Sequence, residues 1–307
     1  MSDLKLFRID NGSAVELEGS SVALEKSLQS LIERNMTALF GVTFLASEYS
    51  TGIRHGGRID SLGLDENGSP VIFEYKRALN ENVINQGLFY LDWLLDHRAE
   101  FKLLVMERHG SELAEGIDWS NPRLICVAHG FTKFDEHAVQ QINRSIELFR
   151  YRDFGGELLA LDLVSAVSGS ALTGASAGGS VEKEKRANAS KTVTNYLEQS
   201  SESLKDLFAE LEAFAFALGD DVTQKTLKHY FAFRRIKNFV CVEVHPQNHQ
   251  LLLYLKIDPS TIELEAGFSR DVRNVGHFGT GDLELRVKDS GALEKAMPLI
   301  QRSYDAS

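Results

Sequence analysis

The sequence has 307 residues, a formal net charge of −11 and a hydrophobic fraction of 43%. This composition is ordinary for a globular protein, and the length allows two domains. No apolar run approaches the roughly 20 residues that span a bilayer, which excludes a membrane helix. The first residues lack the basic-then-apolar pattern of a secretion signal, so we predict a cytoplasmic protein with no membrane contact.

The acidic charge is concentrated in the first half of the chain. Residues 1–165 carry 25 acidic and 16 basic side chains. A tight, non-specific nucleic-acid binder is typically basic, so this balance counts against that class and, in part, against a nuclease. A local basic groove can still occur on a protein with this net charge.

The chain opens with alternating apolar and polar positions over residues 3–18, which predict a β-hairpin. An amphipathic helix is predicted over 21–40, with Ser20 or Ser21 as its N-cap. At 100° per residue, Glu25 lies at the edge of the apolar stripe and Glu33 lies on the solvent side. A strand is predicted over 41–49, followed by a flexible glycine-rich loop over 50–58.

Two strands after this loop carry a set of charged side chains. Asp60 lies on the first strand, and the second runs over residues 71–76. Residues two apart in a strand project from the same face, so Glu74 and Lys76 point together. Two carboxylates with a nearby ammonium are what a magnesium-dependent phosphodiester hydrolase requires.

The turn between these strands decides whether the carboxylates meet. Asn67-Gly68 favours a hairpin. A three-residue loop over 66–68, with Gly68 in the left-handed conformation, places Asp60 opposite Glu74. A two-residue loop places Asp60 opposite Tyr75 instead, and the two carboxylates then lie on opposite faces. The sequence leaves both registers open.

A helix is predicted over 80–98, and it carries Gln86 and Tyr90 four residues apart on one face. Strands are predicted at 101–107, 123–129 and 158–164, and a helix at 134–149. The second of these strands is nearly all apolar, as in a sheet covered on both faces. The order αβββαβαβ predicts an α/β domain, a mixed sheet with helices outside, over residues 1–165.

Small residues followed by charges predict a flexible linker over 166–192. Residues 193–307 are predicted to form a smaller α+β domain with an antiparallel sheet. Its predicted elements are helices at 193–218, 223–235 and 291–303 and strands at 238–245, 250–257, 262–268 and 282–288. The 223–235 segment interleaves basic and aromatic residues, which favours either nucleic-acid contact or an ordinary core-packed helix.

The string Asp60, thirteen residues, Glu74-Tyr75-Lys76, then Gln86-x3-Tyr90 resembles the PD-(D/E)XK nuclease superfamily. Its spacing is similar to that of RecB-type and NucS-like endonucleases. The resemblance covers residues 20–110, and Ile59 stands where the superfamily often has proline. It implies a restriction-endonuclease-like core. The second domain resembles an uncharacterised bacterial domain appended to such modules, which implies no activity.

The resemblance also implies an activity, hydrolysis of DNA phosphodiester bonds with Mg²⁺ or Mn²⁺. The implied metal ligands are Asp60, Glu74 and the Tyr75 carbonyl, and Lys76 is a further catalytic residue. Glu25 is the catalytic glutamate that the first helix would add to the metal site, or else a first-turn carboxylate favoured by the helix dipole. The implied substrate contacts are Gln86, Tyr90, Arg58 and Arg77. Single-stranded and branched DNA, roles in repair, restriction or defence, and a homodimer are all left open. The alternative is a non-catalytic protein that binds nucleic acid or a partner on the same fold.

Overall fold

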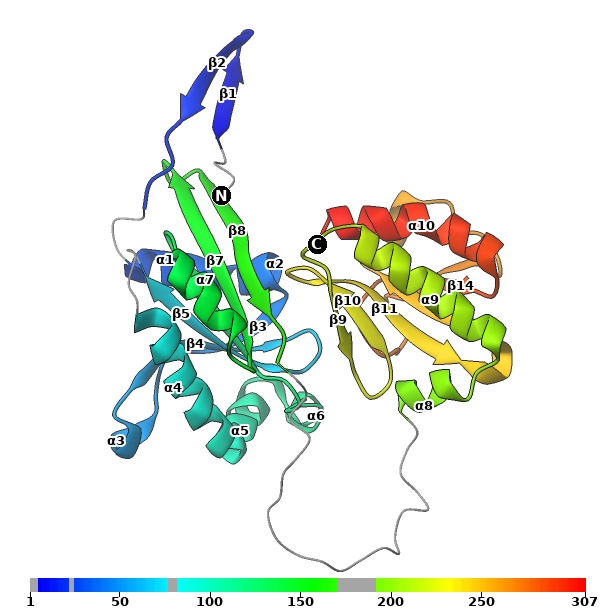
Figure 1. Cartoon of the computed structure of the whole chain (residues 1–307), viewed down its shortest axis with the longest axis horizontal. Helices are drawn as coiled ribbons and strands as arrows, with labels where there is room; N and C mark the ends of the chain where they lie inside the picture. Colours follow the sequence, from blue (N-terminus) through cyan, green and yellow to red (C-terminus); the bar gives the residue numbers. More distant parts are fainter. Residues whose placement is uncertain (1–4, 22–24, 77–81, 170–191) are drawn as a thin grey trace, which may run out of the picture. The chain divides into compact units, whose positions relative to one another are not determined.

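The computed structural model describes residues 5–21, 25–76, 82–169 and 192–307 (Figure 1). The chain forms two compact units, Met1–Ala175 and Ser176–Ser307. The last strand of the first unit continues to Val167, so the first residues assigned to the predicted linker belong to that strand. The rest of the predicted linker, residues 170–191, lies outside the described residues.

The first unit is built on a six-stranded mixed sheet. The strand order is β3-β4-β5-β6-β7-β8; β5, β6 and β7 are parallel, and the other neighbours are antiparallel. This arrangement confirms the predicted α/β fold class. The elements are β1 (Leu6–Asp10), β2 (Ser13–Leu17), α1 (Glu25–Arg34), α2 (Met36–Phe40), β3 (Val42–Ser50), α3 (Gly52–His55), β4 (Arg58–Asp65), β5 (Pro70–Lys76), α4 (Asn82–Asp96), α5 (Arg98–His109), α6 (Ser111–Glu115), β6 (Arg123–Ala128), α7 (Lys133–Gln140), β7 (Ser145–Phe154) and β8 (Leu158–Val167).

Both faces of this sheet are covered, as the apolar run of β6 predicts. Ile72 of β5 belongs to one cluster of buried residues together with Leu91 and Leu94 of α4. On the other face, the ring of Phe40 from α2 packs 5.1 Å from the ring of Phe73. Alternate residues of β5 therefore reach two separate cores, which is why six of its seven residues are buried.

The β4–β5 turn has the longer of the two predicted loops. Asp65 N donates to Ser69 O at 2.9 Å, which leaves residues 66–68 as a three-residue loop. Gly68 has φ +76°, and a Cβ there would lie 2.7 Å from the Gly116 carbonyl oxygen. Only glycine fits both conditions without strain. The strands pair Ser61 with Phe73, so the register that brings Asp60 beside Glu74 is confirmed.

Three predicted elements of the first unit differ from the structure. The 101–107 segment lies in helix α5, where Phe101 and Val105, four residues apart, are buried. Contiguous apolar residues imitate a strand, but here the buried positions follow the helical period. The 134–149 helix ends at Gln140, and strand β7 follows. The 21–40 helix is divided into α1 and α2, and its start at residues 22–24 lies outside the described residues.

The second unit is a smaller α+β domain with an antiparallel six-stranded sheet, as predicted. The sheet order is β13-β14-β12-β11-β10-β9. Buried residues of α8, α9 and α10 form one core with one face of this sheet. The elements are α8 (Val193–Glu198), α9 (Glu202–Ala217), β9 (Thr223–Thr226), β10 (Phe231–Arg234), β11 (Asn238–His245), β12 (Gln250–Leu255), β13 (Ser269–Asp271), β14 (Leu283–Val287) and α10 (Ser290–Asp305), with short 3-10 turns at Pro246–Asn248 and Pro259–Thr261.

The predicted helix at 223–235 is wrong, because this segment forms the β9–β10 hairpin. Phe231 and Phe233 join the helix-covered core, whereas Ala232 belongs to a cluster on the opposite face, which is the period of a strand. The basic and aromatic residues therefore do not share a helix face. The predicted 262–268 strand is also absent from the described structure, where β13 begins at Ser269. No helix in the described part of the chain has the length and apolarity that a membrane crossing requires.

Candidate active site

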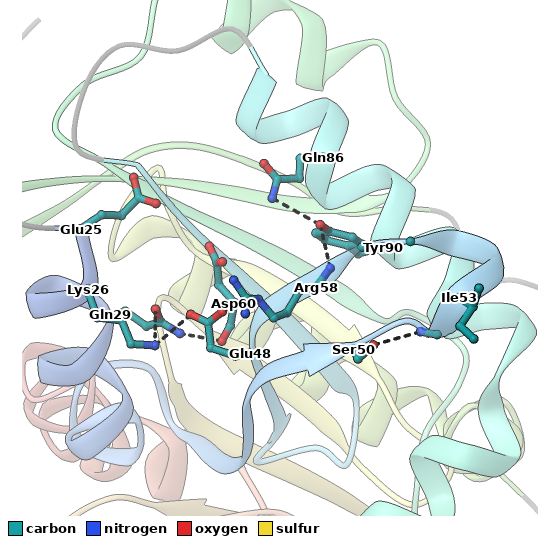
Figure 2. Close-up of a pocket in the computed structure, with 13 residues that line it drawn as sticks. Glu25, Lys26, Gln29, Glu48, Ser50, Ile53, Arg58, Asp60, Gln86 and Tyr90 are labelled. Carbon is teal, nitrogen blue, oxygen red and sulfur yellow. Dashed lines mark hydrogen bonds and ion pairs between the residues drawn. The ribbon is translucent and has the colours of Figure 1, made fainter.

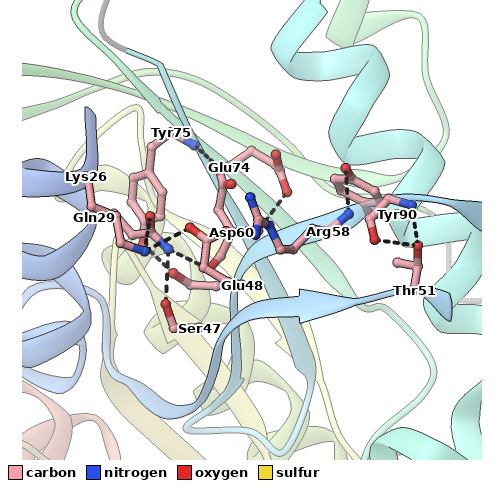
Figure 3. A network of polar contacts seen from close by, with 12 residues as sticks. Lys26, Gln29, Ser47, Glu48, Thr51, Arg58, Asp60, Glu74, Tyr75 and Tyr90 are labelled. Atoms are coloured by element: carbon pink, nitrogen blue, oxygen red, sulfur yellow. Dashed lines mark hydrogen bonds and ion pairs between the residues drawn. The ribbon is translucent and has the colours of Figure 1, made fainter. Parts of the chain in front are cut away.

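Asp60 and Glu74 lie side by side on the neighbouring strands β4 and β5 (Figure 3). The Asp60 backbone N–H donates to Glu74 Oε1 at 3.4 Å. The Tyr75 backbone N–H donates to Asp60 Oδ2 at 3.0 Å. The two strand backbones thus hold both carboxyl groups in place without the help of a flexible side chain.

Glu74 of this pair is buried and Asp60 is partly buried, and neither carboxyl group is hydrogen-bonded to a basic side chain among the described residues. Glu74 is 0% exposed, and its Oε2 atom has no hydrogen-bond partner among the described residues. Burial, and then the charge of Asp60, raise the pKa of Glu74 to about 9. Burial also raises the pKa of Asp60, against the opposing effects of the Tyr75 N–H and Lys76. A buried carboxylate is costly unless it is paired or bound to a cation.

Lys76 is the basic side chain next to the pair. Its side chain is 18% exposed, and its Nζ lies 3.6 Å from Glu25 Oε1 on α1. Glu25 therefore forms an ion pair with Lys76. Within the described residues, no three His, Cys, Asp or Glu side chains are grouped closely enough to hold a metal ion. Arg77, predicted to contact substrate, lies outside the described residues.

The acid pair fits a hard divalent cation in its chemistry. Mg²⁺ takes oxygen ligands and uses one or two carboxylates while keeping several waters. Asp60, Glu74 and the Tyr75 carbonyl could supply such oxygens, as the sequence predicts. The observation in favour is the buried Glu74 Oε2 atom, which lacks a partner in the described structure. A cation would compensate the buried charge and lower the pKa of both carboxyl groups.

Gln86 and Tyr90 lie together on α4, as predicted, at one side of the same site (Figure 2). Gln86 Nε2 donates to the Tyr90 hydroxyl at 3.4 Å, and the Arg58 N–H donates to the same hydroxyl at 3.2 Å. A Cβ on Gly57 would lie 2.5 Å from the Tyr90 ring, so only glycine permits this approach. Tyr90 therefore holds the start of β4, two residues before Asp60.

The 50–58 segment, predicted as a flexible loop, contains the short helix α3 and is closed by Thr51. Thr51 N and Oγ1 donate to Gly57 O at 3.0 and 2.9 Å, and Gly57 N donates to Thr51 Oγ1 at 2.9 Å. These bonds join the two ends of the segment across the α3 turn. They define where β4 begins, and with it the position of Asp60.

Helix α1 contacts the other side of the site through side chains that were not predicted from the sequence. Gln29 is 4% exposed, and its Nε2 donates to the Asp60 carbonyl oxygen at 2.7 Å. Ser61 Oγ donates to Glu33 Oε1 at 2.6 Å. The predicted solvent position of Glu33 is therefore wrong, because a polar contact with β4 draws it inward. The i+4 spacing of Gln29 from Glu25 could have indicated that both face the sheet.

Glu48 on β3 connects two basic residues at the mouth of the site. Glu48 Oε1 lies 2.8 Å from Lys26 Nζ, and Glu48 Oε2 lies 2.6 Å from Arg58 Nε. The backbone of Glu48 has φ +53°, a conformation that costs a residue with a side chain about 1–3 kcal/mol. No sequence pattern indicates this residue, since its role depends on that unusual backbone conformation. With Asp60 and Tyr90, these three side chains line an open cleft of about 850 Å³ (Figure 2).

Comparison with known proteins gives partial matches. Residues 193–307 match the model of a family described as a domain of unknown function (DUF5655). An uncharacterized protein of Haemophilus influenzae is 28% identical over 309 residues, covering 98% of this chain and 99% of that protein. The second unit thus matches a family whose description assigns no activity.

Solved structures resemble part of the chain. A repair endonuclease from Pyrococcus abyssi is 24% identical with a TM-score of 0.29, over 42% of this chain and 47% of that one. EndoMS in its apo form is 19% identical with a TM-score of 0.24, over 45% and 49%. An EndoMS–dsDNA2 complex is 21% identical with a TM-score of 0.25, over 43% and 47%. The aligned part spans about half the length of each of these structures.

Proposed function

We propose that the first unit is a divalent-metal-dependent nuclease that hydrolyses DNA phosphodiester bonds. The observation that carries the proposal is the buried Glu74 carboxyl beside Asp60, with an oxygen that has no partner among the described residues. Ionising Glu74 in this position is costly unless a cation joins the pair. Lys76, beside the same pair, adds the positive charge that phosphodiester chemistry uses.

Each residue has a role that follows from its position. Asp60, Glu74 and the Tyr75 carbonyl would hold Mg²⁺ or Mn²⁺, and the bound cation would supply Lewis-acid stabilisation of the charge that builds on the phosphate. The Lys76 ammonium orients the attacking water and stabilises the same charge. Glu25, at 3.6 Å, positions the Lys76 ammonium at the end of β5.

The remaining residues bind and orient the substrate. Tyr90 and Gln86 hold the start of β4, and Arg58 offers a guanidinium to the phosphate backbone at the cleft. Arg77 is assigned to substrate contact on its place in the sequence motif alone. DNA is the substrate that the resemblance of this motif implies.

Metal titration and DNA cleavage test this proposal together. Calorimetry with Mn²⁺ should show binding to the wild type and none to Asp60→Ala. Asp92→Ala is a matched control, because Asp92 is an exposed acid on α4 of the same unit. Single-stranded, duplex and branched DNA with Mn²⁺ should be cut by the wild type and the control, and not by Asp60→Ala or Lys76→Ala. Cleavage that survives both substitutions contradicts the proposal.

A second candidate function is non-catalytic nucleic-acid binding on the same fold. The observation in its favour is that, within the described residues, no three His, Cys, Asp or Glu side chains are grouped closely enough to hold a metal ion. DNA binding without any Mn²⁺ binding in the same calorimetry would select this alternative.

A further inference from the structure

The Lys26–Glu48–Arg58 cluster forms a second polar feature of the cleft, separate from the acid pair. Lys26 comes from α1, Glu48 from β3 and Arg58 from the start of β4, so three elements meet here (Figure 2). Each oxygen of the Glu48 carboxylate contacts one cation, Lys26 at 2.8 Å and Arg58 at 2.6 Å. The Glu48 carboxylate therefore lies between the two basic side chains and pairs with both.

Both cations keep donors for a ligand. Their side chains are 57% and 66% exposed for Lys26 and Arg58, whereas the Glu48 side chain is 30% exposed. Glu48 contacts Arg58 at Nε, and the two terminal nitrogens of Arg58 make no hydrogen bond with the described residues. A guanidinium held at Nε presents its terminal nitrogens in a fixed direction, as bidentate phosphate contact requires.

Gln29 links the Lys26–Glu48–Arg58 cluster to the backbone of Asp60. Gln29 Oε1 accepts from Lys26 Nζ at 3.2 Å, while Gln29 Nε2 donates to the Asp60 carbonyl oxygen at 2.7 Å. The φ of +53° at Glu48 departs from ordinary strand geometry, and it accompanies a side chain that reaches both cations. The hydrogen bonds to Lys26, together with the charges of Lys26 and Arg58, hold the pKa of Glu48 below its usual value, so it remains a carboxylate at neutral pH.

We propose that Lys26 and Arg58 form a two-point site for a phosphate of the nucleic-acid strand, and that Glu48 is the positioning residue that holds them. This inference rests on the proposed function, because it assigns the strand bound in the same cleft as Asp60. The opposite expectation follows if Glu48 only neutralises the cations. In that case, removing its charge would strengthen the binding of a polyanion, whereas loss of positioning weakens it.

The sign of this effect can be measured without any metal. Binding of a fluorescent single-stranded oligonucleotide is followed by anisotropy in EDTA over a series of salt concentrations. Glu48→Gln keeps the length of the side chain and removes its charge. Glu115→Gln is the matched control, because Glu115 pairs with exposed Lys102 at 2.8 Å, outside the set of residues that line the cleft. Melting temperatures show that each variant is folded.

We expect Glu48→Gln to weaken binding several-fold, with Glu115→Gln unchanged. The salt dependence of log K should fall by about 0.7 for each phosphate interaction that Lys26→Ala or Arg58→Ala removes. Adding Glu48→Gln to the Lys26→Ala/Arg58→Ala double variant should cause no further loss, because Glu48 acts through these two residues. Tighter binding by Glu48→Gln, or a further loss in the triple variant, overturns the proposal.

The outcome is distinguishable from failure of the proposed function. Asp60-dependent cleavage with Mn²⁺, together with tighter binding by Glu48→Gln, rejects the positioning role and leaves the nuclease proposal standing. Weaker binding by Glu48→Gln without any cleavage supports the phosphate site and rejects the nuclease. No binding by the wild type at low salt overturns the inference directly.

Discussion

The two ends of the β4–β5 hairpin both bury carboxylates, but they treat the charge differently. At the turn end, Arg123 is 3% exposed and bonds Glu147 through Nε and Nη2 at 2.8 and 2.9 Å. Its Nη1 bonds Asp65 at 3.1 Å. At the other end, the Asp60 backbone N–H donates to Glu74 Oε1 at 3.4 Å, and no arginine side chain bonds either carboxyl group in the described structure.

The difference separates a structural acid cluster from a candidate binding site. Burial would lower the pKa of Arg123, but the charges of Glu147 and Asp65 more than reverse this effect and raise it. The guanidinium is therefore a permanent counter-ion for its two acids. Glu74 is not bonded to a guanidinium among the described residues; burial and the charge of Asp60 raise its pKa to about 9, and the charge of nearby Lys76 offsets this only in part. A buried acid whose pKa is raised by burial and by a neighbouring carboxylate indicates a candidate functional site.

The largest expected effect comes from removing Arg123 at the turn end of the hairpin. Arg123→Met removes the buried guanidinium that bonds both Asp65 and Glu147, so we expect the free energy of unfolding to fall by about 3–5 kcal/mol. Urea denaturation measures the change. Lys102→Met, which breaks an exposed ion pair, should cost less than about 1 kcal/mol. Equal losses in the two variants would contradict the structural role of Arg123.

Removing the charge of Glu74, at the other end of the hairpin, should change the free energy of unfolding in the opposite direction. The pKa of Glu74 is about 9 in the folded chain and 4.5 as a free group, so the folded state keeps a proton that the unfolded state releases between these values. The free energy of unfolding therefore falls as pH rises through this window. Glu74→Gln should remove this loss and stabilise the metal-free protein at pH 8 by a few kcal/mol, or roughly 5–10 °C in melting temperature.

The same substitution should have almost no effect at pH 5, where the Glu74 carboxyl is protonated in the folded protein. Thermal unfolding of both forms in EDTA at pH 5 and pH 8 tests this. A destabilised Glu74→Gln at pH 8 would show that the carboxylate already has a cationic partner.

Binding of a metal ion at Asp60 and Glu74 should release a proton. At pH 7 the Glu74 carboxyl is protonated, and a bound cation requires the carboxylate. We expect about one proton released per Mn²⁺, measured by calorimetry in buffers of different ionisation enthalpy. Affinity should rise with pH up to about 9. Glu74→Gln, at which no such proton exists, is the control, and equal release by this variant would contradict the assignment.

The smallest effect concerns the support of Asp60 by α4. Tyr90→Phe removes the acceptor for Arg58 N and Gln86, so we expect a loss of about 1 kcal/mol of stability. Thermal unfolding measures the loss, and Mn²⁺ affinity shows whether the start of β4 has moved. Phe89→Tyr, on a half-exposed neighbour in the same helix, is a control that should change neither.

Part of the site could be predicted from residue types and spacing. The alternation of β5 places Glu74 and Lys76 on one face, and this follows from strand geometry alone. The i+4 spacing of Gln86 and Tyr90 predicts that they are neighbours on a helix, and a hydrogen bond joins them in the structure. Local periodicity is sufficient for such predictions, since it involves one element at a time.

Elsewhere local pattern was misleading. The apolar residues of 101–107 imitate a strand, and the basic and aromatic residues of 223–235 imitate a helix. In each case the type of secondary structure follows from which side chains are buried in the core. Phe101 and Val105 bury on a helical period, and Phe231 and Phe233 bury on a strand period.

The sequence by itself determines the acid and lysine residues, the alternation that aligns them along β5, and the glycine turn that permits either register. Tertiary structure decides that Asp60 meets Glu74, because the three-residue loop is held against a separate segment: Asp118 N donates to Gly68 O at 2.8 Å, and Ser69 Oγ donates to Asp118 Oδ2 at 3.3 Å. It also decides that Glu48 joins Lys26 and Arg58. Such contacts depend on where separate elements pack, and the spacing of residues along one element carries no information about that.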